Sequence, residues 1–239
     1  MAPGRDAPQD PPRFYARADA APADGGFAVR LDGRVPRSPG GAPIVLPTRA
    51  LADLVAAEWA AQSGTIVYSA MPATRLAWRA LDGAEAREET ISSIVRYAGA
   101  DLLCYPASGP RALVARQEAV WTPLLSWARG DLGLDFGQSR GILHHAQPPE
   151  TLSRLEALAG EMDAFILAGV AFAAALFGSA IVALALWRGR LDGAQAIAAS
   201  RIDEEFQQAQ WGVDPEAAAR ERDLGGEAAM LRAWFAAVR

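Results

Sequence analysis

The feature that most constrains the fold is a run of 24 residues without a charge, from Ala164 to Trp187. About 20 apolar residues suffice for a helix to cross a bilayer, so the run permits a membrane span. However, nine of the 24 residues are alanine, which adds little transfer free energy. Gly178 followed by Ser179 is also typical of one helix ending and another beginning. The run is therefore either a membrane span or the centre of a helical bundle, where helices are apolar all round.

The residues before this run favour the bundle. Apolar side chains recur there three or four positions apart, which is the pattern of an amphipathic helix in a soluble bundle: Leu152, Leu155, Leu158, Met162 and Phe165. Arg188 and Arg190 follow the run and fit both interpretations, as a positive flank of a span or as the end of a helix.

The N-terminal part of the chain has a different periodicity. FAVRLDGRVPRS alternates apolar and polar residues, Gly40 and Gly41 turn the chain, and PIVLP follows, which predicts one or two hairpins. Thr48 is a good N-cap for a helix over residues 49–62. The segments TIVYS and LLCYP read as short strands, and MPATRLAWRALD and residues 85–98 as helices. We therefore expect a loose tail over residues 1–13 and a small α+β domain over residues 14–105.

From Gly109 onward the pattern is helical, with a break or kink expected at Pro123. Residues 191–211 predict one further helix. Pro215 is a good first residue for another helix, which should end at Gly225–Gly226. A last amphipathic helix is expected after these glycines. We therefore expect residues 106–239 to form an all-α bundle domain, and we expect the fold class to be α+β.

Composition and charge exclude several functions. Half of the residues are apolar, which is ample for a core, and the net charge of −5 argues against a nucleic-acid-binding face. The N-terminus has no apolar signal core, so we expect a cytoplasmic protein. All 23 basic residues are arginine, which with the many alanines indicates a GC-rich bacterial source. The single Cys104 lies in an apolar run and is expected to be a buried thiol.

Signals for chemistry are few. The only histidines are the adjacent pair His144 and His145, and no zinc, phosphate-loop, dinucleotide or nucleophile-elbow motif accompanies them. Neighbouring residues rarely point to one metal ion, so the sequence predicts neither a metal site nor a cofactor.

The polar stretch SRIDEEFQQAQWG is the most distinctive segment of the chain. On a helix of about 100° per residue, Ile202, Phe206, Ala209 and Ala198 form a buried stripe. The acids Asp203, Glu204 and Glu205 point in different directions and do not converge as a catalytic carboxylate pair would. The stretch is therefore either a solvated helix face or a contact surface for a protein partner.

Two tryptophans receive structural interpretations. Trp59 lies on the apolar line of its helix, so we expect it in the core. Trp211 precedes Gly212 at a helix end, where an aromatic ring commonly packs against a neighbouring helix, so we expect it in the core too. Glu58 falls at the edge of the apolar stripe, where it is either hydrogen-bonded and buried or exposed to a partner.

Taken together, several ordered segments resemble the Atp-twelve family of assembly chaperones, which act on the α subunit of the F-type ATP synthase. The segments that carry the resemblance are LDGR, LPT, EWAAQ, MPATRLA, DLLCYPA, WTPLLSWA and IDEEFQQAQWGVD. They span the chain from about Phe14 to Trp211. Trp78, where the family has a small polar residue, and VYSAMP, where it often has Asp-Pro, depart from the pattern.

The resemblance implies a soluble, non-enzymatic protein without membrane insertion and without a cofactor. It implies a chaperone that binds the free α subunit, covers its subunit interface and hands it over for assembly of the α/β ring. The alternatives are an adaptor with a different client, a membrane-anchored protein, and an enzyme using carboxylates with His144 or His145.

The family's acidic stretch matches residues 203–212, and this gives the candidate site. We expect Glu204 to contact the partner, because the helical wheel leaves it without a structural task, and Glu205, Asp203 and Gln207 to accompany it. The residues expected to be structural are Glu58, Trp59, Trp211 and Gly212.

Overall fold

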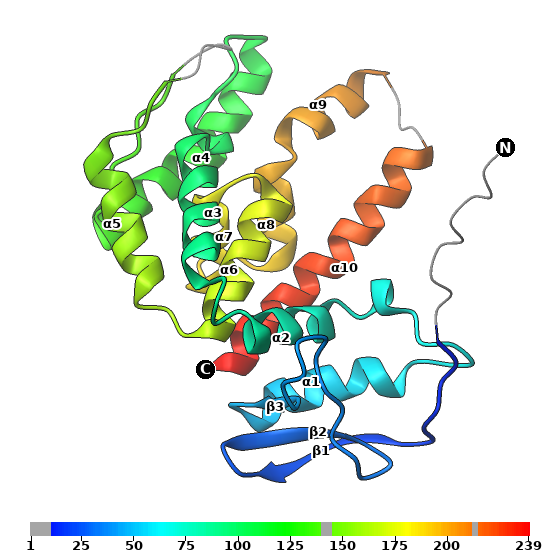
Figure 1. Cartoon of the computed structure of the whole chain (residues 1–239). Helices are drawn as coiled ribbons and strands as arrows, with labels where there is room; N and C mark the ends of the chain where they lie inside the picture. Colours follow the sequence, from blue (N-terminus) through cyan, green and yellow to red (C-terminus); the bar gives the residue numbers. More distant parts are fainter. Residues whose placement is uncertain (1–10, 140–144, 212–214) are drawn as a thin grey trace, which may run out of the picture. The chain divides into compact units, whose positions relative to one another are not determined.

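The computed structural model describes residues 11–139, 145–211 and 215–239, with side chains in the last range from residue 223 onward. The chain forms two compact units, Met1–Asp82 with Ala237–Arg239, and Gly83–Ala236. The first combines a small sheet with helices and the second is helical, so the predicted α+β class is confirmed (Figure 1). The units divide after Asp82, whereas the sequence analysis placed the domain boundary near residue 105.

The first unit is built on an antiparallel sheet of order β1-β2-β3. Strands β1 (Ala18–Ala23) and β2 (Gly26–Leu31) form a hairpin, and β2 also pairs with β3 (Val45–Leu46). Asp24 and Gly25 form the two-residue turn between β1 and β2, and Gly25 has a φ of +83°. Gly26 has a φ of +148°, and a Cβ there would lie 2.2 Å from the carbonyl oxygen of Leu46. The hairpin expected from the sequence is therefore present and requires glycine at this position.

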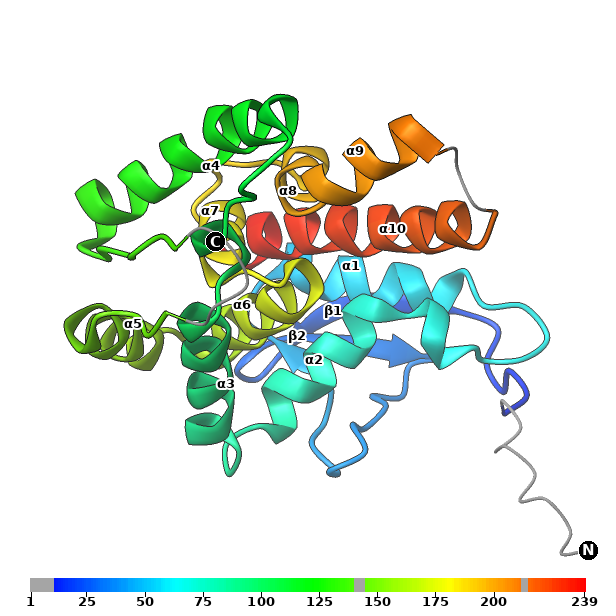
Figure 2. The same ribbon diagram turned by 90° about the horizontal axis from the view of Figure 1, so that it is seen from above.

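Helix α1 (Arg49–Ala60) packs against the sheet of this unit (Figure 1). It begins as predicted, because the Thr48 side chain accepts a hydrogen bond from the Leu51 N–H. Its buried side chains are Leu51, Ala52, Val55, Ala56 and Trp59. The predicted second helix is also present as α2 (Pro72–Asp82), which packs beside α1 (Figure 2).

Two predicted strands are wrong. TIVYS ends instead in the first two residues of the 3-10 helix η1 (Tyr68–Ala70), and LLCYP contains the 3-10 helix η2 (Leu102–Cys104). Both segments have high β-propensity, but neither is paired in the three-stranded sheet. Side chains satisfy the local backbone instead: Gln62 accepts from the Val67 N–H at 2.9 Å, and Asp101 accepts from the Leu103 N–H at 3.1 Å.

The second unit contains the helices from α3 onward. They are α3 (Arg87–Gly99), α4 (Arg111–Leu132), α5 (Pro149–Gly160), α6 (Ala164–Phe177), α7 (Ala180–Trp187), α8 (Gly193–Ser200), α9 (Ile202–Trp211) and α10 (Pro215–Val238), whose last two residues belong to the first unit. Helix α4 continues through Pro123.

The charge-free run forms the centre of this unit. It divides into α6 and α7 at Gly178, which has a φ of +64°, and Ser179, whose hydroxyl accepts from the Val182 N–H. Every residue from Ala180 to Leu186 is buried. Within the described ranges, no helix combines the length and the apolarity that a membrane span needs. The predicted helix break is therefore confirmed, and the bundle interpretation describes the run.

Two predicted helix boundaries are wrong. Residues 191–211 form two helices, because Arg201 (φ −120°, ψ 17°) leaves the helical conformation. Conversely, α10 does not end at Gly225–Gly226 but continues to Val238. Two glycines cost a helix about 1 kcal/mol each. The burial of Leu231, Trp234 and Phe235 further along α10 outweighs that cost.

Candidate functional site

Helix α9 carries the acidic stretch, and it is the least buried of the α-helices whose side chains are all described. Of its ten residues Ile202 alone is buried. The buried stripe predicted for it is therefore wrong: Phe206 is half-buried, and Ala209 and Ala198 are exposed. Because the helical conformation is interrupted at Arg201, the 100° periodicity of α9 does not extend back to Ala198 in α8. Four of the ten residues of α9 are exposed, all in its second half, and five are half-buried.

Asp203 anchors the first turn of α9 to α4. Its Oδ1 accepts a hydrogen bond of 2.7 Å from Gln117 Nε2, and the Gln117 side chain, 1% exposed, also accepts from the Ala107 N–H at 2.8 Å. Burial and the neighbouring Glu204 carboxylate raise the pKa of Asp203, while the hydrogen bond from Gln117 lowers it. The buried amide therefore holds the helix in place by its acidic end.

Glu204 is half-exposed and has an ion-pair partner that the sequence analysis missed. Arg201 Nη1 lies 2.8 Å from Glu204 Oε1, one helical turn away, and both side chains are about 40% exposed (38% and 42%). Glu205 is half-buried and Gln207 is exposed. The i,i+3 spacing of an arginine and a glutamate was the available sequence signal for this pair.

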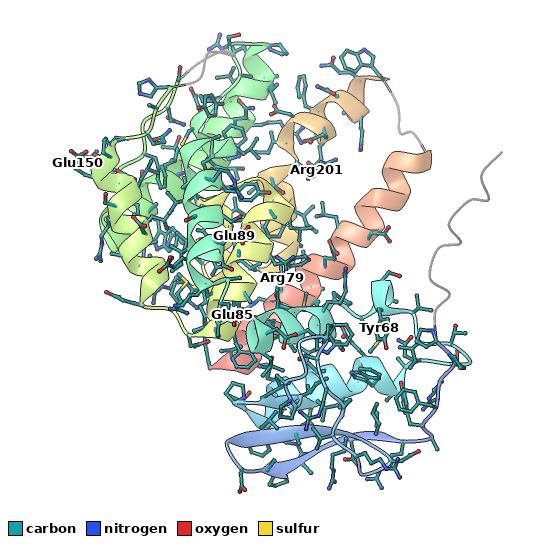
Figure 3. The ribbon with its side chains drawn as sticks, in the orientation of Figure 1. Tyr68, Arg79, Glu85, Glu89, Glu150 and Arg201 are labelled. Carbon is teal, nitrogen blue, oxygen red and sulfur yellow. The ribbon has the colours of Figure 1, made fainter. Side chains whose placement is uncertain are left out.

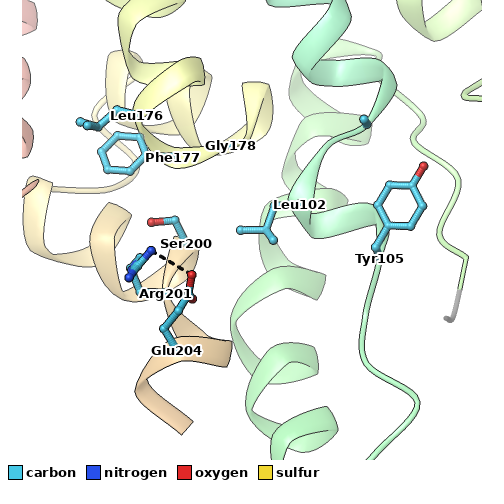
Figure 4. Close-up of a pocket in the computed structure, with 9 residues that line it drawn as sticks. Leu102, Tyr105, Leu176, Phe177, Gly178, Ser200, Arg201 and Glu204 are labelled. Atoms are coloured by element: carbon cyan, nitrogen blue, oxygen red, sulfur yellow. Dashed lines mark ion pairs between the residues drawn. The ribbon is translucent and has the colours of Figure 1, made fainter. Parts of the chain in front are cut away.

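The Arg201–Glu204 pair borders a cavity of about 400 Å³ in the second unit (Figure 4). Leu176 and Phe177, at the end of α6, lie on one side of this cavity, and Leu102 of η2 points into it from the other. The other lining residues are Ala100, Tyr105, Gly178 and Ser200. The cavity was not predicted, because its walls come from segments far apart in the sequence. Figure 3 shows Arg201 at the base of α9.

Trp211 contradicts its structural interpretation, because its side chain is 77% exposed. The helix α9 packs on α4 through its first turn, and Trp211 at the far end meets no covering element in the part of the chain that the structure describes. Gly212, the other structural residue predicted here, lies outside the described residues. Tryptophan is enriched in protein-binding surfaces and among their binding hot spots.

Glu58, in contrast, is held by hydrogen bonds within the first unit. Its carboxylate accepts from the Ala73 N–H at 2.7 Å, from the Thr74 N–H at 2.7 Å and from the Thr74 hydroxyl at 2.8 Å. These donors belong to the first turn of α2, so Glu58 caps that helix from α1. Burial raises the pKa of Glu58, although the three hydrogen bonds act in the opposite direction.

Trp59 is buried as predicted, with 3% of its side chain exposed. Its ring contacts Tyr15 and Tyr68 edge to face at 5.8 and 6.2 Å between centroids, and its backbone carbonyl accepts from the Tyr15 hydroxyl at 2.7 Å. The indole N–H has no hydrogen-bond partner among the described residues. Trp59 thus packs as a core residue.

Metal-binding clusters are not found in the described ranges, where no three His, Cys, Asp or Glu side chains gather around a common point. His145 is described and His144 is not. The expected burial of the Cys104 thiol is confirmed.

One buried carboxylate was not anticipated. Asp101 is fully buried and accepts from the Ser179 hydroxyl at 2.7 Å and the Ile181 N–H at 3.0 Å, at the start of α7. Burial raises its pKa to about 6. Its partners start a helix 80 residues later in the chain, so the sequence carried no sign of them.

Comparisons with known proteins agree with this fold. Residues 12–129 match a family model described as ATP12 chaperone protein. The crystal structure of Atp12 from Paracoccus denitrificans is 38% identical, covers 96% of this chain and 99% of that chain, and has a TM-score of 0.87. The Atu1473 protein of Agrobacterium tumefaciens is 37% identical, covers 96% and 87%, and has a TM-score of 0.89.

A curated mitochondrial protein is more distant. The Atp12 protein of Schizosaccharomyces pombe is 26% identical over 213 residues, which is 84% of this chain and 73% of the relative. The chain belongs to the ATP12 chaperone family, so the resemblance seen in the sequence is confirmed.

Proposed function

We propose that this chain is an assembly chaperone of the F-type ATP synthase that binds the free α subunit. It covers the subunit interface of α and releases α for assembly of the α/β ring. Membership of a chaperone family supports this function, and the similarity to the crystal structure of Atp12 from Paracoccus denitrificans covers 96% of this chain. We expect it to act in the bacterial cytoplasm and to have no catalytic activity.

The need for such a protein follows from the physics of ring subunits. An unassembled subunit exposes a large interface patch, which is an aggregation hazard. A chaperone has to cover that patch and still release it, which favours a polar contact of moderate size over an extensive apolar one.

The observation that carries the proposed site is the exposure of α9. Its acids, amides and terminal tryptophan lie on a helix of which only the first residue is buried. We propose that the client contacts Glu204, Glu205, Asp203 and Gln207 on this helix. Asp203 also holds α9 against α4, by accepting the hydrogen bond from Gln117.

A co-purification experiment tests both parts. The tagged chain is expressed with the α and β subunits of the same source and captured, and the captured proteins are identified. We expect α alone to be retained, and we expect Glu204→Lys to lose it while remaining folded by circular dichroism. Glu156→Lys is the matched control, since Glu156 is an exposed acid on α5.

The outcomes separate function from site. Equal retention of α by wild type and Glu204→Lys would support the function and overturn the site. If α is never retained, the α-subunit assignment is wrong and an adaptor with another client takes its place.

A further inference from the structure

The cavity beside α9 combines an apolar interior with a charged rim. Leu102, Leu176 and Phe177 supply apolar surface, and the Arg201–Glu204 pair stands at the edge (Figure 4). Leu102 and Leu176 are half-buried, so their side chains remain accessible from the cavity. The site is therefore suited to a ligand that presents an apolar group and a polar group close together.

The size of the cavity limits the apolar group. A volume of about 400 Å³ is small, near the lower end of the ~300–1,000 Å³ typical of ligand pockets. Such a space accommodates one or two side chains and is too small for the apolar face of a whole helix. The ligand is therefore a short segment that inserts an anchor residue.

The charged residues at the start of α9 determine which residue can stand next to the anchor residue of the ligand. The first turn of α9 carries Asp203, Glu204 and Glu205, and among the described residues that line the cavity Arg201 is the one cation. Asp203 already accepts a hydrogen bond from Gln117. Glu204 instead forms an ion pair with Arg201 in which both side chains are about 40% exposed, so solvent weakens the attraction between them. A cation on the ligand meets an excess of negative charge here and can share or replace Arg201 as the partner of Glu204.

We propose that this cavity receives an aliphatic or aromatic side chain of the α subunit that stands next to an arginine or lysine, whose cation pairs with Glu204. The site is an anchor point for the client beside the exposed face of α9. This inference rests on the proposed function, because it takes the α subunit as the occupant.

The first test obstructs the cavity without adding a charge. Ala100 lines the cavity and is exposed, so Ala100→Phe places a ring at its mouth without disturbing the core. Ala157→Phe makes the same change at an exposed position of α5 that does not line the cavity. In a calorimetric titration with purified α subunit, we expect Ala100→Phe to weaken binding about tenfold and Ala157→Phe less than about twofold.

The second test identifies the occupant. A photoreactive benzoylphenylalanine replaces Ala100, and in the control it replaces Ala157. After irradiation of the complex with α, mass spectrometry identifies the cross-linked peptide. We expect position 100 to label a segment of α in which an apolar residue adjoins arginine or lysine, and position 157 to label no defined segment.

Each result decides the proposal. If α binds wild type and Ala100→Phe equally, or if the labelled segment has no basic residue beside its apolar one, the cavity is not the anchor point and the proposed function stands. If α does not bind the wild-type chain, both the proposed function and this inference are overturned.

Discussion

A glutamate and a tryptophan occur together in two helices of this protein and have opposite environments. In α1, Trp59 is 3% exposed and Glu58 accepts three hydrogen bonds from α2. In α9, Trp211 is 77% exposed and Glu204 is paired with the half-exposed Arg201. The same residue types are therefore held by neighbours in one unit and are largely or partly exposed in the other.

The difference arises from what packs against each helix. Helix α1 lies against the sheet and beside α2, so both of its flanks are covered within the first unit. Helix α9 touches α4 through its first turn, where Asp203 meets Gln117. An aromatic ring or an acid is structural where neighbours satisfy it and is free to bind where they do not.

The largest effect is expected from Trp59→Ala. Removing this buried ring leaves a cavity between Tyr15 and Tyr68 and should lower the free energy of unfolding by about 3–5 kcal/mol. Urea denaturation followed by circular dichroism measures it. Trp59→Phe keeps an aromatic ring and removes the unpaired indole N–H, so it should cost less than half as much. Equal losses for both variants would contradict a packing role.

Features set by neighbouring residues could be predicted from the sequence. Thr48 and the Gly178–Ser179 break cap helices through contacts within four residues, so their signals are complete in the local sequence. The segments TIVYS and LLCYP failed because a strand needs a partner, and partners are not visible locally.

The second prediction is Glu58→Ala, which removes the acceptor for three donors at the start of α2. We expect a loss of about 2–3 kcal/mol in unfolding free energy, since the partners are partly buried. Asp53→Ala in the same helix is the control. Asp53 forms an exposed pair with Arg49 at 2.9 Å, and its loss should change stability by no more than about 0.5 kcal/mol. A similar cost for both acids would refute the capping role.

The third prediction concerns Asp101, the buried carboxylate of the second unit. Its pKa is raised by burial to about 6, from 3.8, so the folded state binds the proton more tightly than the unfolded state. The stability that this proton contributes is present at low pH and is lost as pH rises through 6.

Asp101→Asn removes this titration. Between pH 5 and pH 8 the stability of wild type relative to the variant should fall by about 1 kcal/mol, because wild type alone loses the contribution. Paired urea titrations at the two pH values measure the difference. A constant gap would show that Asp101 has the same pKa in the folded and unfolded states.

The candidate site was predictable only in part, for the same reason that the strands failed. The sequence located the acids of α9 but not Arg201 as the partner of Glu204, nor Gln117 as the partner of Asp203, which is 86 residues away. It also predicted Trp211 in the core, and this was wrong. An aromatic residue at a helix end packs inward only if a neighbouring element is there to cover it, and the local sequence does not show whether one is.

The smallest effect on folding, and the sharpest test of the comparison, is expected from Trp211→Ala. Because the ring is 77% exposed, its loss should change the free energy of unfolding by no more than about 0.5 kcal/mol. If α9 is the client surface, the same variant should bind the α subunit about tenfold more weakly, since exposed tryptophans are frequent binding hot spots.

Phe14→Ala provides the matched control for this variant. Phe14 is 70% exposed and belongs to the first unit, so its removal should weaken binding of α less than about twofold. Equal weakening by both variants would mean that exposed aromatic area in general, and not α9, attracts the client. Weakening by Phe14→Ala alone would transfer the client surface to the first unit and leave the exposure of Trp211 without a function in binding.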